Sequence, residues 1–128
     1  MWRISTALAG MALLVATLGP TASAAMVADT PRYKTYVVCS AKKSAQASHS
    51  CPVDKPKTAI FLSKDRDATY KVCVKFPGKQ NKLCASHQPA EEDVKSGVSI
   101  TSNRIGSHKV TWFVGGQQVG TYFFTVHD

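Results

Sequence analysis

The sequence predicts an all-β fold, an antiparallel β-sandwich of about seven strands, from three observations. No segment keeps a helical periodicity for three turns. Short runs rich in β-branched and aromatic residues recur along the chain between turn-forming residues. The stretch 108–126 holds two such runs on either side of Gly115-Gly116, and a Gly-Gly pair between alternating apolar runs is typical of a β-hairpin. We therefore expect the core to be built against this hairpin.

The first 24 residues are typical of a signal peptide. Arg3 precedes the apolar run 4–18, and the Ala-Ser-Ala tripeptide 22–24 fits the rule for cleavage before Ala25. The alternative is a membrane anchor, but the run is shorter than the ~20 residues of a spanning helix. No cysteine follows the run closely, so a lipoprotein is not expected. We expect a single domain, 25–128, that is secreted or periplasmic.

The composition is basic. Sixteen Lys and Arg stand against eight Asp and Glu, which gives a formal net charge of +8, or +7 once Arg3 leaves with the signal peptide. Such a balance favours anionic partners, although it also keeps an exported protein soluble. The lysines are spread along the chain and form no specific nucleic-acid motif.

Four cysteines in a short exported chain predict two disulfides, since the compartment is oxidising. Of the three possible connectivities we favour Cys39–Cys51 and Cys73–Cys84, because each closes a local loop of about a dozen residues. Each bridge of this kind contributes about 3 kcal/mol in the chain-entropy model. A zinc or redox centre is the alternative, but no C-x-x-C spacing exists. We expect both bridges to be structural and to lie outside the core.

Strands are expected over 33–40, 58–63, 68–76, 81–86, 98–102 and the two arms of the final hairpin. The segment 41–50 has no alternation and reads as an exposed loop, and 51–57 is extended because it contains two prolines. The acidic segment 88–95 is either a solvated connection or a single helical turn.

The segment 68–76 shows the period-two alternation of a strand with one wet face. Its inward-facing residues are Tyr70, Val72, Val74 and Phe76. We expect 81–86 to return antiparallel, with Leu83 facing inward and Cys84 facing outward, opposite Cys73.

The final hairpin needs a β-bulge. With a two-residue turn at Gly115-Gly116, Trp112 lies opposite Val119, and continuing that register exposes the apolar side chains beyond Gly120. An extra residue near Val119-Gly120 reverses the phase, and a glycine in a strand interior often marks such a bulge. The bulged register turns Val119, Tyr122, Phe124 and Val126 inward.

The stretch 106–126 (GSHKVTWFVGGQQVGTYFFTV) resembles the last hairpin of bacterial secreted immunoglobulin-like domains, and 51–56 (CPVDKP) is similar to the entry of some of them. The resemblance implies a two-sheet sandwich of about seven strands. The antibody-type disulfide, buried between the sheets beside a tryptophan, is not expected here. Cys73 and Cys84 alternate outward, and Trp112 has no cysteine near it in the sequence.

The sequence carries no local catalytic or metal-binding signature. Its four histidines, His49, His87, His108 and His127, are scattered, and we expect solvated or edge positions for them. We therefore expect no metal, no cofactor and no enzymatic activity. The alternative is a site assembled from distant positions, for example His87 with Glu91 or Glu92.

The functional hypothesis is a non-catalytic binding module. In the bulged register one sheet face carries Lys71, Lys75, Lys109, Phe113 and Phe123. Aromatic side chains rimmed by charge are typical of an interaction surface. The expected partner is another protein or an anionic extracellular polymer, and the oligomeric state is left open.

The alternative hypothesis is a secreted protease inhibitor. The loop 41–50, held at both ends by Cys39 and Cys51, presents Lys42 or Lys43 to a trypsin-like protease. A loop held in its bound shape loses little entropy on binding.

Overall fold

The computed structural model describes residues 32–78 and 82–128. The predicted signal peptide and its cleavage point lie outside the described residues. Eight β-strands follow one another along the described chain. They are β1 (Tyr33–Val38), β2 (Ser50–Pro52), β3 (Lys57–Ser63), β4 (Ala68–Lys75), β5 (Lys82–Ala90), β6 (Ser96–Ile100), β7 (Gly106–Val114) and β8 (Gln117–His127).

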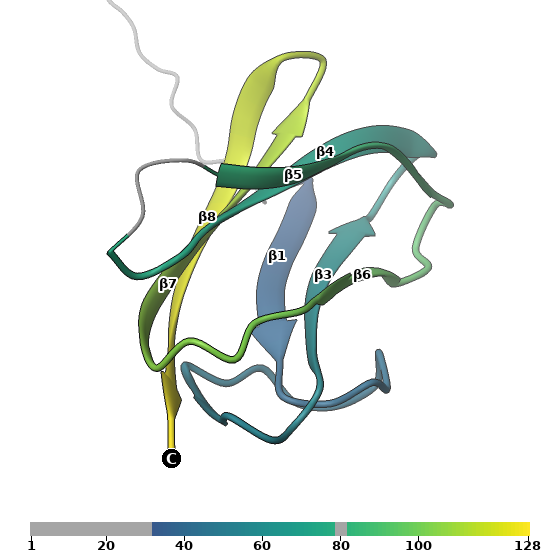
Figure 1. The fold of residues 1–128 in the computed structure, drawn as a ribbon. Coiled ribbons are helices and arrows are strands. Elements are labelled where there is room, and N and C mark those ends of the chain that lie inside the picture. The colour runs from purple at the N-terminus through teal and green to yellow at the C-terminus, as the bar shows by residue number, and fades with distance from the viewer. Residues whose placement is uncertain (1–31, 79–81) are drawn as a thin grey trace, which may run out of the picture. The chain divides into compact units, whose positions relative to one another are not determined.

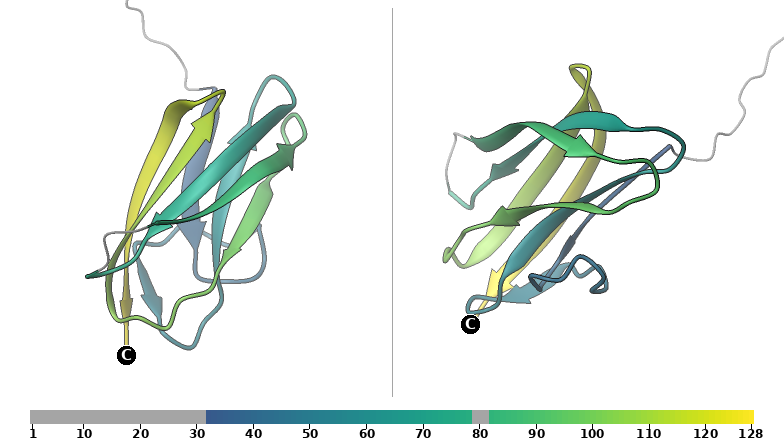
Figure 2. Two further views of the ribbon diagram at one scale, coloured as in Figure 1. Left: turned by 45° about the horizontal axis from the view of Figure 1, so that its top comes forward. Right: turned by 90° about the vertical axis from the view of Figure 1, so that its right-hand side faces the viewer.

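The strands form two sheets, which Figure 1 shows from one side and Figure 2 from two further directions. One sheet has the order β1-β3-β6, and the other has the order β2-β8-β7-β4-β5. All strand pairs are antiparallel except that of β2 with β8, which is parallel. The predicted all-β sandwich is confirmed. Its additional strand is β2, which joins the last residue of the predicted loop 41–50 to the start of the segment 51–57 that was predicted to be extended.

Strand β5 is longer than the sequence predicted. It continues to Ala90 and so takes in the start of the segment that was expected to be a connection or a helical turn. Pro89 lies opposite Thr69 near its end. Proline is tolerated there because β5 is an edge strand, so its missing N–H breaks no ladder on the free side.

The core lies between the sheets and is built against the β7–β8 hairpin, as predicted. Trp112 and Phe124 are almost completely buried, and Phe61 of the opposite sheet stacks on Tyr70 with ring centroids 4.2 Å apart. The indole N–H of Trp112 is buried without a hydrogen-bond partner among the described residues. Such a group costs about 1–3 kcal/mol, which the apolar contacts of the large ring offset.

The predicted bulge in the final hairpin is confirmed. Trp112 pairs with Gly120 and Phe113 pairs with Gln118, so Val119 is the extra residue. Beyond the bulge Phe124 and Val126 are buried, whereas Phe123 is 54% exposed. The turn at Gly115-Gly116 has φ values of 59° and 81°, which glycine adopts without strain.

The two disulfides form with the predicted connectivity, Cys39–Cys51 and Cys73–Cys84. The expectation that both lie outside the core is wrong for the first. Cys51 is completely buried in the core cluster, with Cys39 packed against it. Cys39 directly follows β1 and Cys51 belongs to β2, so this bridge links the two sheets.

The second bridge joins directly opposite residues of β4 and β5, on the face away from the core residues Val72 and Val74. Two such bridges favour an oxidising compartment, outside the cytoplasm. Among residues 32–78 and 82–128, no helix is long and apolar enough to cross a membrane.

One side of the sandwich is closed where β8 meets β1. A Cβ atom added at Gly120 would lie 2.8 Å from Cγ2 of Thr35 and closer still to its Oγ1. Glycine is required here because real Cβ atoms do not approach other atoms so closely. Gly120 therefore serves both the bulge and the contact between the sheets.

We expect Gly120→Ala to lower the free energy of unfolding by about 2 kcal/mol, because overpacking forces the two strands apart. Chemical denaturation of the oxidised protein measures this. The double variant with Thr35→Gly makes room for the new methyl group, so a double-mutant cycle should show that the two changes offset each other. Strictly additive effects would contradict the proposed clash.

Candidate binding surface

The structure brings the five predicted surface residues together on the outer face of the five-stranded sheet. Lys71 lies directly opposite Phe113, Lys109 lies opposite Phe123, and Lys75 lies opposite Lys109. Residues opposite each other in an antiparallel pair project from the same face of the sheet. We call these five residues the basic-aromatic face.

A fourth lysine, which the sequence analysis did not select, extends this face. Lys82 of β5 lies opposite Lys75 of β4, which in turn lies opposite Lys109 of β7. The three side chains are exposed and form what we call the lysine row, which crosses three adjacent strands at one level. The signal was present in the sequence, because pairing Cys73 with Cys84 already places Lys75 opposite Lys82.

No strand of the five-stranded sheet contains an Asp or a Glu. Five carboxylates lie instead in the turns 64–67 and 91–95, where the backbone N–H of Glu92 donates to Asp67. The ion pairs of the described residues join Asp65 to Arg32 and Arg66, away from the lysine row. Like charges directly opposite each other destabilise a sheet. Repulsion within the lysine row therefore lowers the stability of the folded protein, and no acidic residue of these strands offsets it.

The two phenylalanines of the face differ in availability. The ammonium of Lys71 lies 4.8 Å from the ring centroid of Phe113, and that ring is partly buried. The ammonium of Lys109 lies 5.9 Å from the centroid of Phe123, near the limit of a cation–π contact. Phe123 also borders a shallow hollow of about 500 Å³ that Lys75 and Lys109 line. The hollow therefore combines two positive charges with one accessible ring.

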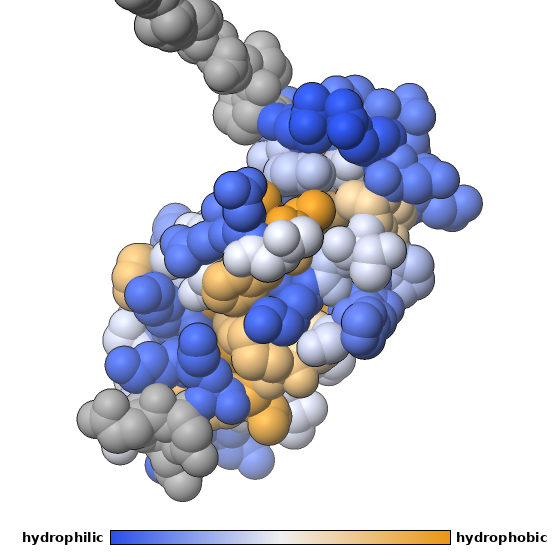
Figure 3. All heavy atoms as spheres, turned by 90° about the horizontal axis from the view of Figure 1, so that it is seen from above, coloured by the Kyte–Doolittle hydropathy of each residue, from blue (hydrophilic) through white to orange (hydrophobic). Residues whose placement is uncertain are grey.

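Leu83 does not face a closed core as predicted, since it is 66% exposed. It lies opposite Val74 and so on the inner face, but β5 and β6 are both edge strands and leave a groove of about 160 Å³ between them. The apolar lining of this groove includes Val98 and Ile100. Figure 3 shows one face of the molecule, on which apolar side chains gather in a band between hydrophilic ones.

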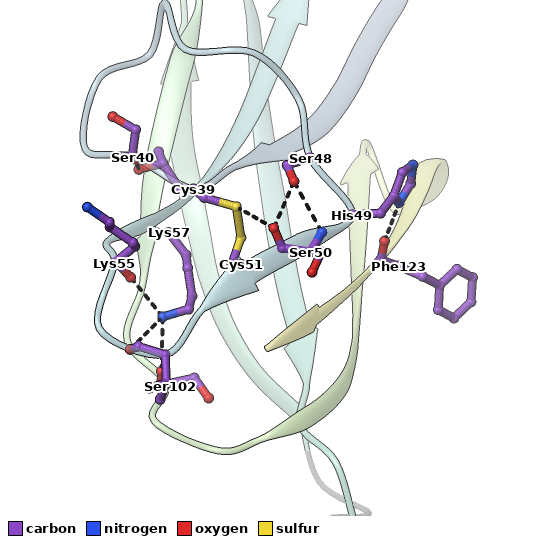
Figure 4. Close-up of a disulfide and its surroundings, with 12 residues drawn as sticks. Cys39, Ser40, Ser48, His49, Ser50, Cys51, Lys55, Lys57, Ser102 and Phe123 are labelled. Atoms are coloured by element: carbon purple, nitrogen blue, oxygen red, sulfur yellow. Dashed lines mark hydrogen bonds between the residues drawn. A yellow bond between two sulfur atoms is a disulfide. The ribbon is translucent and has the colours of Figure 1, made fainter. Parts of the chain in front are cut away.

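A buried lysine supports the end of the sandwich near the first disulfide (Figure 4). Lys57 is 3% exposed, and its ammonium donates hydrogen bonds to three backbone carbonyls, those of Val53 at 3.2 Å, Lys55 at 2.8 Å and Ser102 at 3.4 Å. A buried charge needs such partners because it has lost its water. The ammonium thus ties the β2–β3 turn to the segment between β6 and β7.

His108 contradicts the expectation of solvated or edge histidines, because it is completely buried. Its Nδ1–H donates to the carbonyl of Gly106 at 3.0 Å, which leaves Nε2 to accept from the hydroxyl of Ser102 at 2.8 Å. Its ring stacks on Phe124. Burial lowers the pKa of His108, the Gly106 carbonyl opposes this, and the positive charge of Lys57 lowers the pKa further.

The loop 41–50 lies against β8. The ring of His49 stacks on Tyr122 with centroids 4.2 Å apart, and its Nδ1 bonds the carbonyl of Phe123 at 2.6 Å. Lys42 and Lys43 are exposed, and Lys42 opens a turn that the backbone N–H of Ala45 closes at 3.1 Å.

The residues of the distant-site alternative are not brought into one cavity. His87 lines a hollow beside Phe113, whereas Glu91 lines a separate hollow beside Asp67. Within the described part of the chain, no group of three or more His, Cys, Asp or Glu side chains has the arrangement of a metal site.

Comparisons with known proteins support the fold. The structure is similar to that of an immunoglobulin-like protein from Pseudomonas aeruginosa, with a TM-score of 0.53 and 14% sequence identity, over 77% of this chain and 94% of that chain. No protein-family model matches the sequence, and no curated protein matches it. At this identity the likeness shows the fold alone, which is an immunoglobulin-like β-sandwich.

The pH dependence of stability should report on His108. Its pKa in the folded protein lies below the ordinary value of 6.5. The buried, neutral ring therefore contributes fully to the free energy of unfolding above pH 6.5, and this contribution is lost as the pH falls below 6.5. Denaturation between about pH 7.5 and 5 should show a decline that is smaller in His108→Phe, which cannot titrate. The exposed His87→Gln serves as the control and should decline as the wild type does. An unchanged decline in His108→Phe would contradict this assignment.

The lysine row should cost stability at low ionic strength. We expect Lys75→Gln to raise the free energy of unfolding by about 0.5 kcal/mol, because it removes the central like charge. The gain should vanish near 1 M salt, where the screening length is about 3 Å. Lys34→Gln is the matched control, since Lys34 is exposed on β1 and faces Leu62. An equal gain in the control would rule out repulsion within the row.

Proposed function

We propose that the protein is a secreted, non-catalytic binding module whose basic-aromatic face contacts a partner, either another protein or an anionic extracellular polymer. The observation that carries this proposal is the arrangement of Lys71, Lys75, Lys109, Phe113 and Phe123 side by side on a sheet whose strands contain no carboxylate. Export after cleavage at residue 24 belongs to the same proposal, and the two disulfides support it.

The rigidity of the face supports a binding role. Its side chains stand on paired strands, and the Cys73–Cys84 bridge lies between the levels of Lys71 and Lys75. A surface that is already ordered loses little conformational entropy when a partner binds. Its hollows are open and shallow, whereas small-molecule sites bury most of their ligand. The geometry therefore favours recognition of an extended partner.

The inhibitor hypothesis stays a prediction. Lys42 and Lys43 are accessible, as an inhibitor requires, but Lys42 begins a tight turn. No feature of the loop 41–50 favours protease binding over an ordinary tied loop.

Affinity capture tests the proposed function. The oxidised protein is immobilised, and extracellular material is passed over it. We expect a captured component whose yield falls at least about tenfold with Lys71→Gln/Lys109→Gln/Phe123→Thr, because these changes remove two charge contacts and the accessible ring.

The matched control is Lys34→Gln/Lys55→Gln/Val94→Thr, which removes two exposed lysines and one exposed apolar side chain outside the face. It should capture as the wild type does, with circular dichroism confirming that both variants are folded. Equal capture by the two variants, or equal loss in both, would contradict the use of this face.

A further inference from the structure

The lysine row and Phe123 form one continuous line across four strands. Lys82, Lys75 and Lys109 are successive cross-strand neighbours, and Phe123 follows Lys109 on β8. Neighbouring strands are about 4.8 Å apart, so the first and third lysine stems emerge roughly 10 Å from each other. A ligand lying along this line would therefore meet three positive charges at regular steps and then an aromatic ring.

Hydroxyl groups flank the Lys109–Phe123 pair on both sides. Ser107 pairs with Thr125 at one level, and Thr111 pairs with Thr121 at the other. All four side chains share the outer face with Lys109 and Phe123, by the period-two alternation of β7 and β8. Ser107, Thr121 and Thr125 are exposed, whereas Thr111 is buried, so three hydroxyl groups that both donate and accept hydrogen bonds lie beside the aromatic end of the line.

We propose that this line is a binding site for an acidic polysaccharide, a linear glycan whose sugar rings carry carboxylates. The inference rests on the proposed function and names its partner class. The ammonium groups of the lysine row pair with carboxylates on successive sugars. The apolar face of the terminal bound sugar packs on Phe123, and the flanking hydroxyls bond sugar hydroxyls.

The face fits a glycan better than a protein or a nucleic acid. A protein interface has an apolar, charge-depleted centre, but the centre of this face holds lysines and threonines. Binders of single-stranded nucleic acid stack successive bases on several rings. Here Phe113 is partly buried with Lys71 over its ring, and Phe123 is the ring left accessible on this line.

The repulsion within the row also indicates an anionic ligand. Three lysines held in direct register destabilise the free protein, as the absence of acidic residues from these strands leaves the charges uncompensated. A bound polyanion removes this repulsion, so ligand binding and stability are linked. A defined oligogalacturonate should therefore raise the melting temperature of the wild type at low salt.

Isothermal titration calorimetry with that oligogalacturonate tests the proposal. The probe should bind the oxidised protein, with an affinity that falls as salt rises, and its methyl-esterified form, which has lost the charges, should bind at least about tenfold more weakly. Lys75→Gln/Lys82→Gln/Lys109→Gln should weaken binding of the acidic probe by at least about tenfold. Phe123→Thr should weaken it too, with the salt dependence unchanged.

The control variant Lys34→Gln/Lys55→Gln/Lys95→Gln has the same net charge as the variant that lacks the lysine row. It should bind the acidic probe within about twofold of the wild type. Equal loss in this variant would show attraction by net charge alone and overturn the site. Equal or tighter binding of an oligothymidylate with the same number of charges would assign the row to nucleic acid instead.

If the oligogalacturonate does not bind while capture still depends on the basic-aromatic face, this inference fails and the proposed function stands. If face-dependent capture fails too, both fall.

Discussion

The bulge at Val119 is the constraint on which the two faces of the C-terminal hairpin depend. It lets β8 change phase near its start, so that Phe124 enters the core while Phe123 points to solvent. Without the extra residue, every side chain beyond Gly120 would project from the opposite face. The core and the binding surface are thus specified by the same local irregularity, and the glycine that permits it also lets β1 approach β8.

Two structural devices hold the end of the sandwich opposite that glycine. The Cys39–Cys51 bridge links the two sheets covalently, and Lys57 gathers three carbonyls from two connections. Ser102 belongs to both halves of the polar network, because its carbonyl accepts from Lys57 and its hydroxyl bonds His108. These interactions let a small domain order its connections without enlarging its apolar core.

Features that depend on local alternation were predictable from the sequence, as the Cys73–Cys84 register and the bulge show. Features that depend on what covers a residue were not. Leu83 obeys the alternation but lies at a rim where no strand covers it. His108 was expected at a solvated or edge position, although it alternates inward with Val110 and Trp112 in β7, and Phe124 and Ser102 of the β6–β7 connection complete its burial. Lys82 is an intermediate case. The predicted pairing of Cys73 with Cys84 already implies that Lys82 lies opposite Lys75, but the sequence analysis did not follow the pairing to that residue.

The separation of charge along β4 has a consequence for how the molecule approaches a partner. The strand begins beside the acidic turns and ends at Lys75, roughly 23 Å away at the rise of an extended chain. The two turns hold five carboxylates against three basic side chains, whereas the other end of the strand holds the lysine row, so charge is unequally divided along β4. A negatively charged surface attracts the lysine row more strongly than these turns, so the turns would face away from the surface as the molecule approaches. Encounters would then begin in the productive orientation more often than random tumbling allows.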